Sequence, residues 1–424
     1  MFLFIYHFVW TLIALPMVPV IALSGNRRLA ERIGLRVPPP VEKGNIWIHA
    51  LSVGEVVSAV PLVKALQEAF PSRGVVFTVS TATGMRIARE ALQGRVQVLH
   101  TMPFDGWWAV RRFIRRIRPA VFILVETDIW PGFLNYLQGL GVPSILVNGR
   151  ISPRTHRAYR RASWLVRRMF KPLKMCLMQS ELDRRRLLEV GLAPQKVLTT
   201  GNIKFDRNVP LLDDKERHHW LRLLNLTASD PVWVAGSTHR GEEDMVLQAF
   251  ERLRLAYPSL RLILAPRDIS RTMELKSTIR SMKMQVVVRS KFPENRGEYD
   301  VLLLDTYGEL DRIYGLGWVS FVGGSLVPVG GHNLLEPASL GSPVVFGPYT
   351  QNFVFMAAAI VEAGGGIQVA DADTLYAAVK DLLDHPGQRA EMGDKGMAFV
   401  AQNRGAVKHV VSWVRKHITA GEVA

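Results

Sequence analysis

Two glycine pairs and a carboxylate lie close together between residues 321 and 348. An apolar run ends at Gly323-Gly324, and Gly330 and Gly331 precede His332-Asn333-Leu334-Leu335-Glu336, which has the pattern of a helix start. Glycines between a strand and a helix N-terminus let backbone N–H groups approach an anion, and the helix dipole favours negative charge there. Glu336 could then accept hydrogen bonds from ribose hydroxyls. The segment predicts a nucleotide site, although glycines also occur in tight strand–helix corners that bind nothing.

Three further segments of the second half follow the same logic. Gly236 and Ser237 come after an apolar run and before a helical pattern, which suggests a second anion-binding loop. Pro266 and Arg267 end the next expected strand, and Gly308-Glu309-Leu310 begins a helix two strands later. Each signal is weak alone. All of them fall on the carboxyl edge of an alternating sheet, which is where parallel α/β proteins bind ligands.

Charged residues follow three expected strands of the first half. Glu55, in Ser52-Val53-Gly54-Glu55, lies where the first strand meets the first helix. A carboxylate there can act as general base on a sugar hydroxyl, but Glu is also common in a first helical turn as a dipole partner. Glu126 and Asp128 end another strand, where carboxylates are costly unless exposed, paired or functional. Lys204 could meet a phosphate or a carboxylate, or pair with Asp206.

Other kinds of chemistry find little support in the sequence. The 11 histidines are scattered, and the adjacent His218 and His219 have no companion cysteines. No Walker A motif and no Ser/His nucleophile motif is present. We therefore expect no metal ion and no cofactor. The single cysteine, Cys176, excludes an intramolecular disulfide and fits a reducing cytosol.

Short β-rich runs alternate with helical patterns, which is typical of parallel βαβ units. The expected strands are residues 46–51, 75–80, 96–100, 121–125, 145–147 and 175–178, then 232–235, 260–264, 286–288, 301–304, 319–322 and 344–346. A chain of 424 residues can form two such domains. We expect two doubly wound Rossmann-like α/β domains facing across a cleft. The expected boundaries are an anchor over 1–24, a first domain over 25–205, a linker over 206–230, a second domain over 231–405 and a C-terminal helix over 406–424 that could pack back on the first domain.

The N-terminus and the charge distribution both point to a membrane. Residues 2–23 contain no Asp, Glu, Lys or Arg, and 22 residues in one helix would reach ~33 Å, about one hydrocarbon core. Arginines at 27, 28, 32 and 36 follow, so the positive-inside rule keeps the remaining chain cytoplasmic. A helix lying in the membrane interface, or buried in the first domain, is the alternative.

The excess positive charge is confined to the first half. Residues 1–210 hold 30 Lys/Arg against 12 Asp/Glu, a net charge of +18, whereas residues 211–424 hold 23 against 25, a net charge of −2. Arginines interleaved with aromatics over 107–118 and 150–174 could bind nucleic acid or anionic lipid headgroups. Beside an apolar N-terminus, anionic membrane lipid is the favoured partner and nucleic acid is not expected.

Several motifs together closely resemble the lipid A Kdo transferases of Gram-negative bacteria, which transfer 3-deoxy-D-manno-octulosonic acid (Kdo). The motifs are SVGE, ETDIWP, NGRIS, GNIKFD, GSTHRGEE, APRD and FVGGSLVPVGGHNLLEPA, and they run from about residue 46 to residue 348. The resemblance implies a GT-B fold and an inverting transfer of Kdo from CMP-Kdo. The acceptor would be the phosphorylated tetraacyl disaccharide precursor of lipid A, at the cytoplasmic face of the inner membrane, in lipopolysaccharide core biosynthesis.

The resemblance also implies roles for individual residues. Glu55 of SVGE matches the family's proton acceptor, and Glu126 of ETDIWP and Lys204 of GNIKFD match its transition-state stabilisers. The CMP-binding segments correspond to Pro266-Arg267, to Gly308-Glu309-Leu310 and to Asn333, Leu334, Leu335 and Glu336. Two alternatives remain: a GT-B sugar-nucleotide epimerase or hydrolase, and a non-catalytic module that binds anionic lipid. The apolar N-terminus argues against a soluble epimerase, and the glycine-rich segments of the second half argue against the module.

Overall fold

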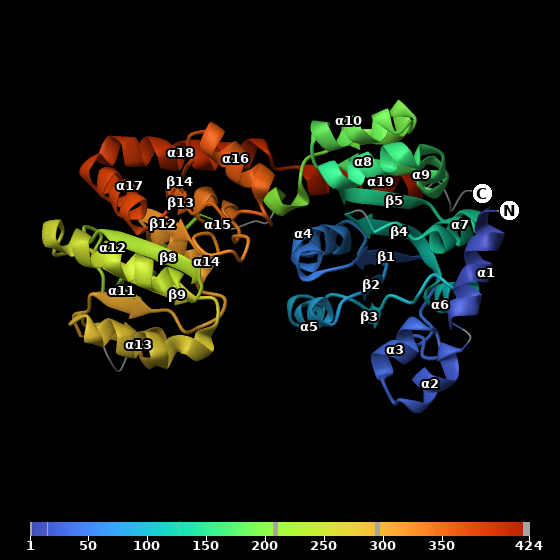
Figure 1. Ribbon diagram of the computed structural model, residues 1–424, viewed down its shortest axis with the longest axis horizontal. Coiled ribbons are helices and arrows are strands. Elements are labelled where there is room, and N and C mark those ends of the chain that lie inside the picture. The colour runs from blue at the N-terminus through green and yellow to red at the C-terminus, as the bar shows by residue number, and fades with distance from the viewer. Residues whose placement is uncertain (1, 15, 127, 207–210, 293–296, 419–424) are drawn as a thin grey trace. The chain divides into compact units, whose positions relative to one another are not determined.

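The computed structural model describes residues 2–14, 16–126, 128–206, 211–292 and 297–418. The chain forms two compact units, Met1–Asn208 with Asn403–Ala424, and Val209–Gln402 (Figure 1). Each unit contains a seven-stranded sheet, and the strand pairings described in both sheets are parallel. The predicted pair of parallel α/β domains is thereby confirmed.

The sheet of the first unit has the strand order β3-β2-β1-β4-β5-β6-β7. Its strands are β1 (Asn45–Ala50), β2 (Val75–Val79), β3 (Val98–Thr101), β4 (Pro119–Val125), β5 (Ser144–Gly149), β6 (Met175–Met178) and β7 (Val197–Thr199). The order reverses between β1 and β4. Parallel sheets bind ligands outside the carboxyl ends of the strands at such a reversal, so the residues that follow β1 and β4 are well placed for a site.

Helices cover both faces of this sheet. One face carries α4 (Val53–Ala69), α5 (Ala82–Ala91) and α19 (Ala406–Ile418), and the other carries α6 (Trp107–Ile117), α7 (Pro131–Gly139) and α9 (Ser163–Phe170). The remaining helices of the basic region and beyond are α8 (Pro153–Arg161) and α10 (Glu181–Glu189). Side chains alternate along β1, so Ile46 and Ile48 enter the core beneath α4, α5 and α19 while Trp47 enters the core on the opposite face of the same sheet. The centre of the Trp47 ring lies 4.2 Å from that of Phe122.

The sheet of the second unit has the order β10-β11-β9-β8-β12-β13-β14, which reverses between β8 and β12. Its strands are β8 (Val232–Thr238), β9 (Arg261–Pro266), β10 (Val286–Val288), β11 (Val301–Leu303), β12 (Val319–Val322), β13 (Val344–Phe346) and β14 (Gly366–Gln368). Its helices are α11 (Asp214–Leu223), α12 (Glu242–Ala256), α13 (Thr272–Ser281), α14 (Leu310–Ile313), α15 (Leu335–Ser339), α16 (Val354–Glu362), α17 (Ala372–Asp384) and α18 (Pro386–Gln402). Apolar faces of α12, α13 and α17 form the larger core.

The structure contains all twelve expected strand runs and adds β7 and β14. Both additional strands have three residues and lie at a sheet edge, where so short a run leaves no clear pattern in the sequence. The predicted linker at 206–230 also differs from the structure, because α11 occupies part of it. Leu221 and Leu224 bury their side chains in the second unit, and this burial outweighs the polar composition of the segment.

The N-terminal segment differs more from its prediction than the linker does. The sequence predicted one membrane-anchor helix over residues 1–24, but the structure has two helices there, α1 (Phe2–Ala14) and α2 (Met17–Leu23), followed by α3 (Arg27–Arg32). Pro16 is the N-cap of α2; proline has no N–H to donate and its ring clashes with the preceding helical turn. Within residues 2–14, 16–126 and the other described ranges, no helix has the length and apolarity needed to cross a bilayer.

Helix α1 lies beside α7 in the first unit (Figure 1). A buried carboxylate joins the two helices. Asp105 is fully buried and accepts hydrogen bonds from the Tyr6 hydroxyl at 2.8 Å and from the amides of Gly132 and Phe133 at 2.6 and 2.7 Å. The two amides belong to the first turn of α7, whose dipole favours a negative charge. Burial raises the pKa of Asp105 to about 7 despite these hydrogen bonds. A single side chain therefore joins α1 to the start of α7.

Candidate active site

A pocket lies at the carboxyl ends of β1, β4 and β5 in the first unit. It is lined by Leu51, Glu55, Glu126, Asp128, Arg150, Ser152 and Thr155. Three different βα connections contribute to this lining, and it occupies the reversal of strand order between β1 and β4. Glu55 and Glu126, which are 71 positions apart in the sequence, are thus brought to one site. Sequence reasoning did not single out Arg150, Ser152 or Thr155 as site residues, although Arg150 directly follows β5.

Glu55 is the residue of this pocket whose pKa is clearly shifted. It lies in the first turn of α4, after Ser52 at the N-cap, and only 6% of its surface is exposed. Its carboxylate accepts hydrogen bonds from the Leu51 amide at 2.5 Å and the Ser52 hydroxyl at 3.1 Å. Burial raises the pKa of Glu55 to about 7, with further upward contributions from the charges of Glu126 and Asp128. The residue therefore caps the helix and is also a base with a pKa near neutral pH.

Glu126 directly follows β4 in an unusual backbone conformation. Its φ of 58° is left-handed, which is rare for a residue other than glycine and often marks a functional site. Its amide donates to the Val147 carbonyl at 2.8 Å, and its carboxylate lies 3.7 Å from the Lys204 ammonium. Lys204 belongs to a short 3₁₀ helix, Ile203–Asp206. The structure therefore brings the two predicted transition-state stabilisers together.

Asp206 has a different role from the one weighed in the sequence. Its two carboxylate oxygens accept the amides of Gly405 and Val407 at 2.5 and 2.6 Å, which caps the start of α19. Helix α19 packs on α4, the helix that begins at Glu55. The C-terminal helix is consequently part of the support of the pocket.

A fully buried histidine stands behind Asp128. Asp128 Oδ2 lies 3.3 Å from His49 Nε2 and accepts the Trp130 indole N–H at 2.8 Å. His49 Nδ1 lies 3.0 Å from the Thr78 hydroxyl. These contacts hold the Asp128 carboxylate at the pocket wall. The pocket thus contains three carboxylates, and each of them has a specific partner.

The predicted nucleotide-binding segments of the second unit lie at carboxyl ends of its strands. Pro266 is buried at the end of β9, whereas Arg267 is exposed and donates its amide to Thr238 at 2.9 Å. Gly308, with a φ of 83°, precedes α14. Glu309 forms an ion pair with Arg289 at 2.7 Å, so its carboxylate is already used within the protein.

Asn333 and Glu336 lie at the start of α15. The side-chain nitrogen of Asn333, Nδ2, donates to Glu336 Oε1 at 3.2 Å. The side-chain oxygen, Oδ1, accepts a hydrogen bond from the backbone amide of Leu335 at 3.2 Å. Leu334 and Leu335 are buried and anchor this turn to the unit. Asn333 therefore orients Glu336, which is the residue expected to meet a ribose.

Two histidines that the sequence analysis did not select meet beside these segments. His239, after β8, and His332, before α15, have Nε2 atoms 2.8 Å apart and ring planes inclined by 6°. Burial lowers the pKa of His332 to about 4, and the charges of His239 and Arg267 contribute in the same direction. A signal was available, since both residues follow neighbouring parallel strands and so must reach the same edge of the sheet.

The glycine-rich loops differ from the open anion sites that the sequence predicted. The amides of Gly330 and Gly331 both donate to the Gly324 carbonyl, at 3.1 and 2.6 Å. A Cβ atom on Gly236 would lie 2.0 Å from the Tyr314 hydroxyl, so this glycine permits close packing. Ser237, beside it, has a left-handed φ of 57°.

A buried carboxylate occupies the amides of the turn after β12. Glu242, at the start of α12, is fully buried and accepts the amides of Gly324, Ser325 and Leu326 at 2.7 to 2.8 Å. The protein supplies its own anion to this turn.

The fold places the protein among two-domain proteins with a GT-B-like fold. It is similar to the UDP-GlcNAc 2-epimerase of Neisseria meningitidis, with a TM-score of 0.60 and 12% identity, covering 88% of this chain and 100% of that one. It is also similar to a glycosyltransferase from Rickettsia africae, with a TM-score of 0.57 and 12% identity, covering 89% and 99%. At such low identity these likenesses show a GT-B-like fold and nothing finer.

Sequence comparison then identifies the family. Residues 27–207 match the family model described as 3-Deoxy-D-manno-octulosonic-acid transferase (kdotransferase). A 3-deoxy-D-manno-octulosonic acid transferase of Haemophilus influenzae is 34% identical over 399 residues, which cover 93% of this chain and 92% of the relative. One of Bordetella pertussis is 34% identical, covering 90% and 89%. The chain belongs to the 3-deoxy-D-manno-octulosonic acid transferase family of glycosyltransferases.

Proposed function

We propose that this protein transfers Kdo from CMP-Kdo to the phosphorylated tetraacyl disaccharide precursor of lipid A, with inversion at the anomeric carbon. The observation that carries the proposal is the state of Glu55, a buried carboxylate with a pKa raised to about 7 in a pocket that also holds Glu126 and Asp128. A base with this pKa is half ionised near neutral pH and suits removal of a proton from a sugar hydroxyl.

The proposed chemistry is a single displacement. Glu55 takes the proton of an acceptor hydroxyl as its oxygen forms a bond to the anomeric carbon of Kdo. The bond from that carbon to the CMP phosphate oxygen breaks, and CMP leaves with the electron pair. Positive charge develops on the sugar ring during this exchange, and the carboxylates of Glu126 and Asp128 can stabilise it. Lys204, 3.7 Å from Glu126, fixes the position of that carboxylate.

CMP-Kdo is assigned to the second unit. Exposed Arg267 supplies a positive charge for the phosphate, and Glu336 at the start of α15 is positioned by Asn333 to accept ribose hydroxyls. Pro266, Gly308, Glu309 and Leu310 complete the segments assigned to the nucleotide. We propose that side chains alone offset the charge of the leaving CMP and that no metal ion is required.

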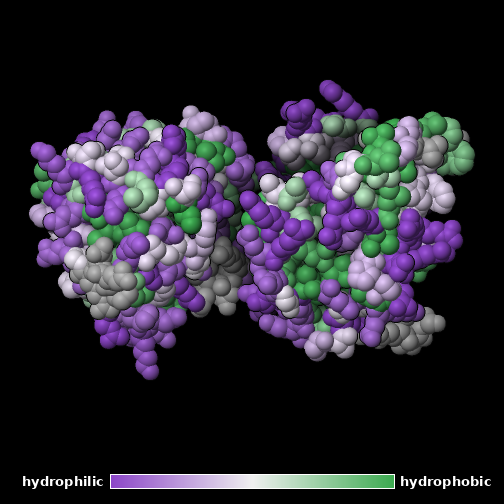
Figure 2. All heavy atoms as spheres, turned by 90° about the horizontal axis from the view of Figure 1, so that it is seen from below, coloured by the Kyte–Doolittle hydropathy of each residue, from purple (hydrophilic) through white to green (hydrophobic). Residues whose placement is uncertain are grey.

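The N-terminal helices suit a protein that lies on the cytoplasmic side of the inner membrane. On α1 the side chains of Phe4, Phe8 and Leu12 are 75%, 54% and 58% exposed and recur every fourth residue, so they form one apolar face. Figure 2 shows hydrophobic side chains on the surface of the first unit, at the end that carries α1 to α3. Such a face can enter the headgroup region of a bilayer without crossing it, and exposed arginines of α6, α8 and α9 can meet anionic lipid.

The decisive experiment supplies the full chain with CMP-Kdo, generated in situ, and the tetraacyl disaccharide bisphosphate, and measures products by mass spectrometry. We expect acceptor products that are heavier by one or more Kdo units, and none from Glu55→Gln. Glu68→Gln is the matched control, because Glu68 is an exposed residue of the same helix. Absence of product from the unaltered protein with verified donor and acceptor would refute the proposal. Epimerisation of a sugar nucleotide instead would favour the epimerase class that shares this fold.

A further inference from the structure

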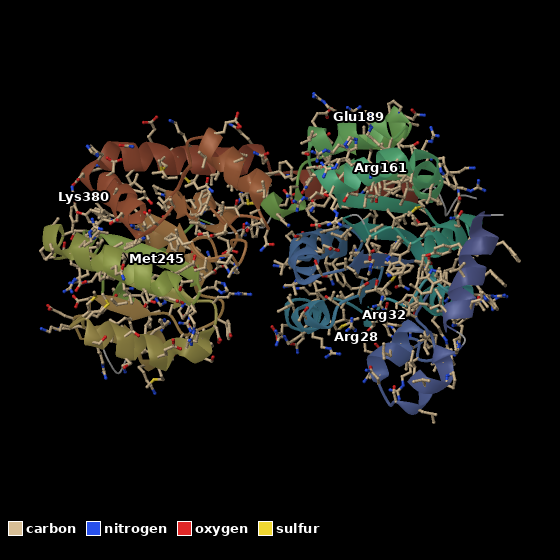
Figure 3. All side chains as sticks on the ribbon, viewed as in Figure 1. Arg28, Arg32, Arg161, Glu189, Met245 and Lys380 are labelled. Carbon is tan, nitrogen blue, oxygen red and sulfur yellow. The ribbon has the colours of Figure 1, made fainter. Side chains whose placement is uncertain are left out.

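Two arginines of α3, Arg28 and Arg32, lie outside the pocket lining and form no ion pair with the described part of the chain. Arg28 and Arg32 are one helical turn apart, so their side chains leave the same face of α3 (Figure 3). Among the residues that the structure describes, neither has a carboxylate within ion-pair distance. The acidic residue between them, Glu31, is bonded instead to the Thr101 hydroxyl at 2.6 Å and to Arg27 at 3.1 Å.

Both guanidinium groups are held in defined positions. Arg28 donates to the Ser80 carbonyl, just beyond β2, and the guanidinium of Arg32 lies 4.0 Å from the centre of the Phe104 ring. The Nε atoms of both residues are buried and have no hydrogen-bond partner within the described part of the chain. Placing these groups in a partly buried position and near each other is unfavourable, and burial followed by the charge of Arg28 lowers the pKa of Arg32.

The C-terminal end of α3 is fixed equally firmly. The Trp108 indole donates to the Ile33 carbonyl at 2.8 Å, and the Phe104 amide donates to the Arg32 carbonyl at 2.6 Å. Gly34 has a φ of 77° and approaches α6 so closely that a Cβ atom there would lie 2.8 Å from the Cβ of Ala109. The pair is therefore presented by a rigid support, as binding residues generally are.

A short chain of contacts links this pair to the pocket. Arg28 holds the backbone of Ser80, whose hydroxyl lies 3.4 Å from His49 Nε2. That same nitrogen lies 3.3 Å from Asp128 Oδ2 at the pocket wall. The charge of Asp128 also acts on Arg32. The arginine pair is therefore connected to the wall of the pocket that contains Glu55. One ligand could place an anionic group on the two arginines and a hydroxyl at Glu55.

We propose that Arg28 and Arg32 bind a phosphate group of the acceptor and thereby orient its reactive hydroxyl toward Glu55. Paired guanidinium groups offer several N–H donors in the geometry that suits a phosphate dianion. The location fits a lipid acceptor, because α3 directly follows α2 and the apolar N-terminal helices. This inference rests on the proposed function. It names Arg28 and Arg32 as the site that recognises a phosphate of the acceptor.

The test compares steady-state kinetics on three acceptors, the tetraacyl bisphosphate and its two monophosphate forms. We expect Arg28→Gln and Arg32→Gln each to raise KM for the bisphosphate about tenfold, the loss of a hydrogen bond to a charged group, while KM for CMP-Kdo stays unchanged. For the unaltered protein, removal of one particular phosphate from the acceptor should raise KM to the same extent. For the two variants, removal of that phosphate should change KM little further. This non-additivity identifies a direct contact.

Controls separate binding from folding and from the donor. Arg27→Gln removes a guanidinium from the same helix, but Arg27 is 77% exposed and pairs with Glu31, so acceptor KM should not change. Arg32→Lys keeps a charge beside Phe104, and Arg28→Gln leaves the aromatic contact intact, so at least one variant should fold. Variants that discriminate the three acceptors as the unaltered protein does would overturn the inference. A change in KM for CMP-Kdo alone would also overturn it, by showing that the site holds the carboxylate of the donor.

A binding measurement makes the inference separable from the proposed function. Isothermal titration of the full chain with inorganic phosphate should show a weak site that is missing from the Arg28→Gln/Arg32→Gln double variant. If the unaltered protein makes no Kdo product but this difference is present, only the proposed activity fails. If product forms and no difference is found in titration or in kinetics, only the inference fails.

Discussion

The ammonium of Lys204 and the carboxylate of Glu126 lie 3.7 Å apart, although 78 positions separate them in the sequence. Both side chains are about one quarter exposed, so the contact is accessible to solvent at the pocket. We expect Lys204→Gln to change the free energy of unfolding by less than about 1 kcal/mol, because partly exposed ion pairs contribute little to stability. Transfer activity should nevertheless fall about 100-fold, since Glu126 loses its orienting charge. Urea unfolding and initial rates measure the two effects, with exposed Lys64→Gln as control.

The pH dependence of transfer should report on Glu55. Its pKa is raised to about 7, so the ionised base becomes ten times scarcer with each pH unit below 7. We expect kcat/KM to rise with pH up to about 7 and then to level off. Glu126→Gln removes a negative charge that raises this pKa, so the midpoint in that variant should move to lower pH. A profile that is flat between pH 5 and pH 8 would exclude Glu55 as the base.

Glu55 should also make the protein less stable as the pH rises. The folded state holds its proton up to about pH 7, whereas the unfolded state loses it near 4.5. Between these values the folded state binds more protons, so the free energy of unfolding decreases with increasing pH. Glu55→Gln lacks this term and should gain stability relative to the unaltered protein between pH 4.5 and pH 8, by up to about 3 kcal/mol. Thermal unfolding of both proteins at the two pH values measures the difference.

CMP binding should depend on Arg267 and not on Glu55. Replacement by alanine removes an exposed positive charge beside His332, and we expect the Kd for CMP to rise about 10- to 100-fold. Arg240→Ala is the matched control, because Arg240 is 75% exposed and pairs with Glu274. Isothermal titration with CMP should give unchanged affinity for Glu55→Gln. Weakened CMP binding in that variant would indicate that Glu55 has a structural role.

Membrane association should depend on the exposed face of α1. Phe8→Glu and Leu12→Glu place charges where 54% and 58% of the native side chains are exposed, so folding should be unaffected. We expect flotation with anionic vesicles to fall at least several-fold. Leu255→Glu is the control, since Leu255 is 86% exposed on α12 of the other unit. Equal flotation of all three variants and the unaltered protein would place the membrane contact elsewhere.

Local patterns predicted the strands because a parallel strand buried on both faces is a continuous apolar run. The run Ile46–Ile48 is an example, with no exposure at any of its three residues. The position of Glu55 in a first helical turn followed from the same order of strand and helix. The two short edge strands, β7 and β14, were missed because three residues at an edge need no such run.

The apolar composition of the N-terminus and the positions of glycines predicted the structure less well, because tertiary contacts decide their outcome. Residues 2–23 have the composition of a spanning helix, but Pro16 separates two helices and Asp105 binds Tyr6 from 99 positions away. Gly236 and Gly330 suggested anion loops, yet one permits close packing against Tyr314 and the other donates its amide to Gly324. Glycine permits a close approach without specifying whether a ligand or the protein itself makes it.

The sequence by itself determined the two parallel α/β units, the strand ends at which the site residues lie, and the family, because these depend on hydrophobic periodicity and on short motifs. Tertiary structure alone decided the properties that depend on distance and burial. The raised pKa of Glu55 needs desolvation together with the charges of Glu126 and Asp128. The pairing of Lys204 with Glu126 and the contacts of Arg28 with Ser80 and of Arg32 with Phe104 likewise arise from segments that meet only in the folded chain. Electrostatic energies depend on the distance between the charges and on their burial, and neither quantity can be obtained from separation along the sequence.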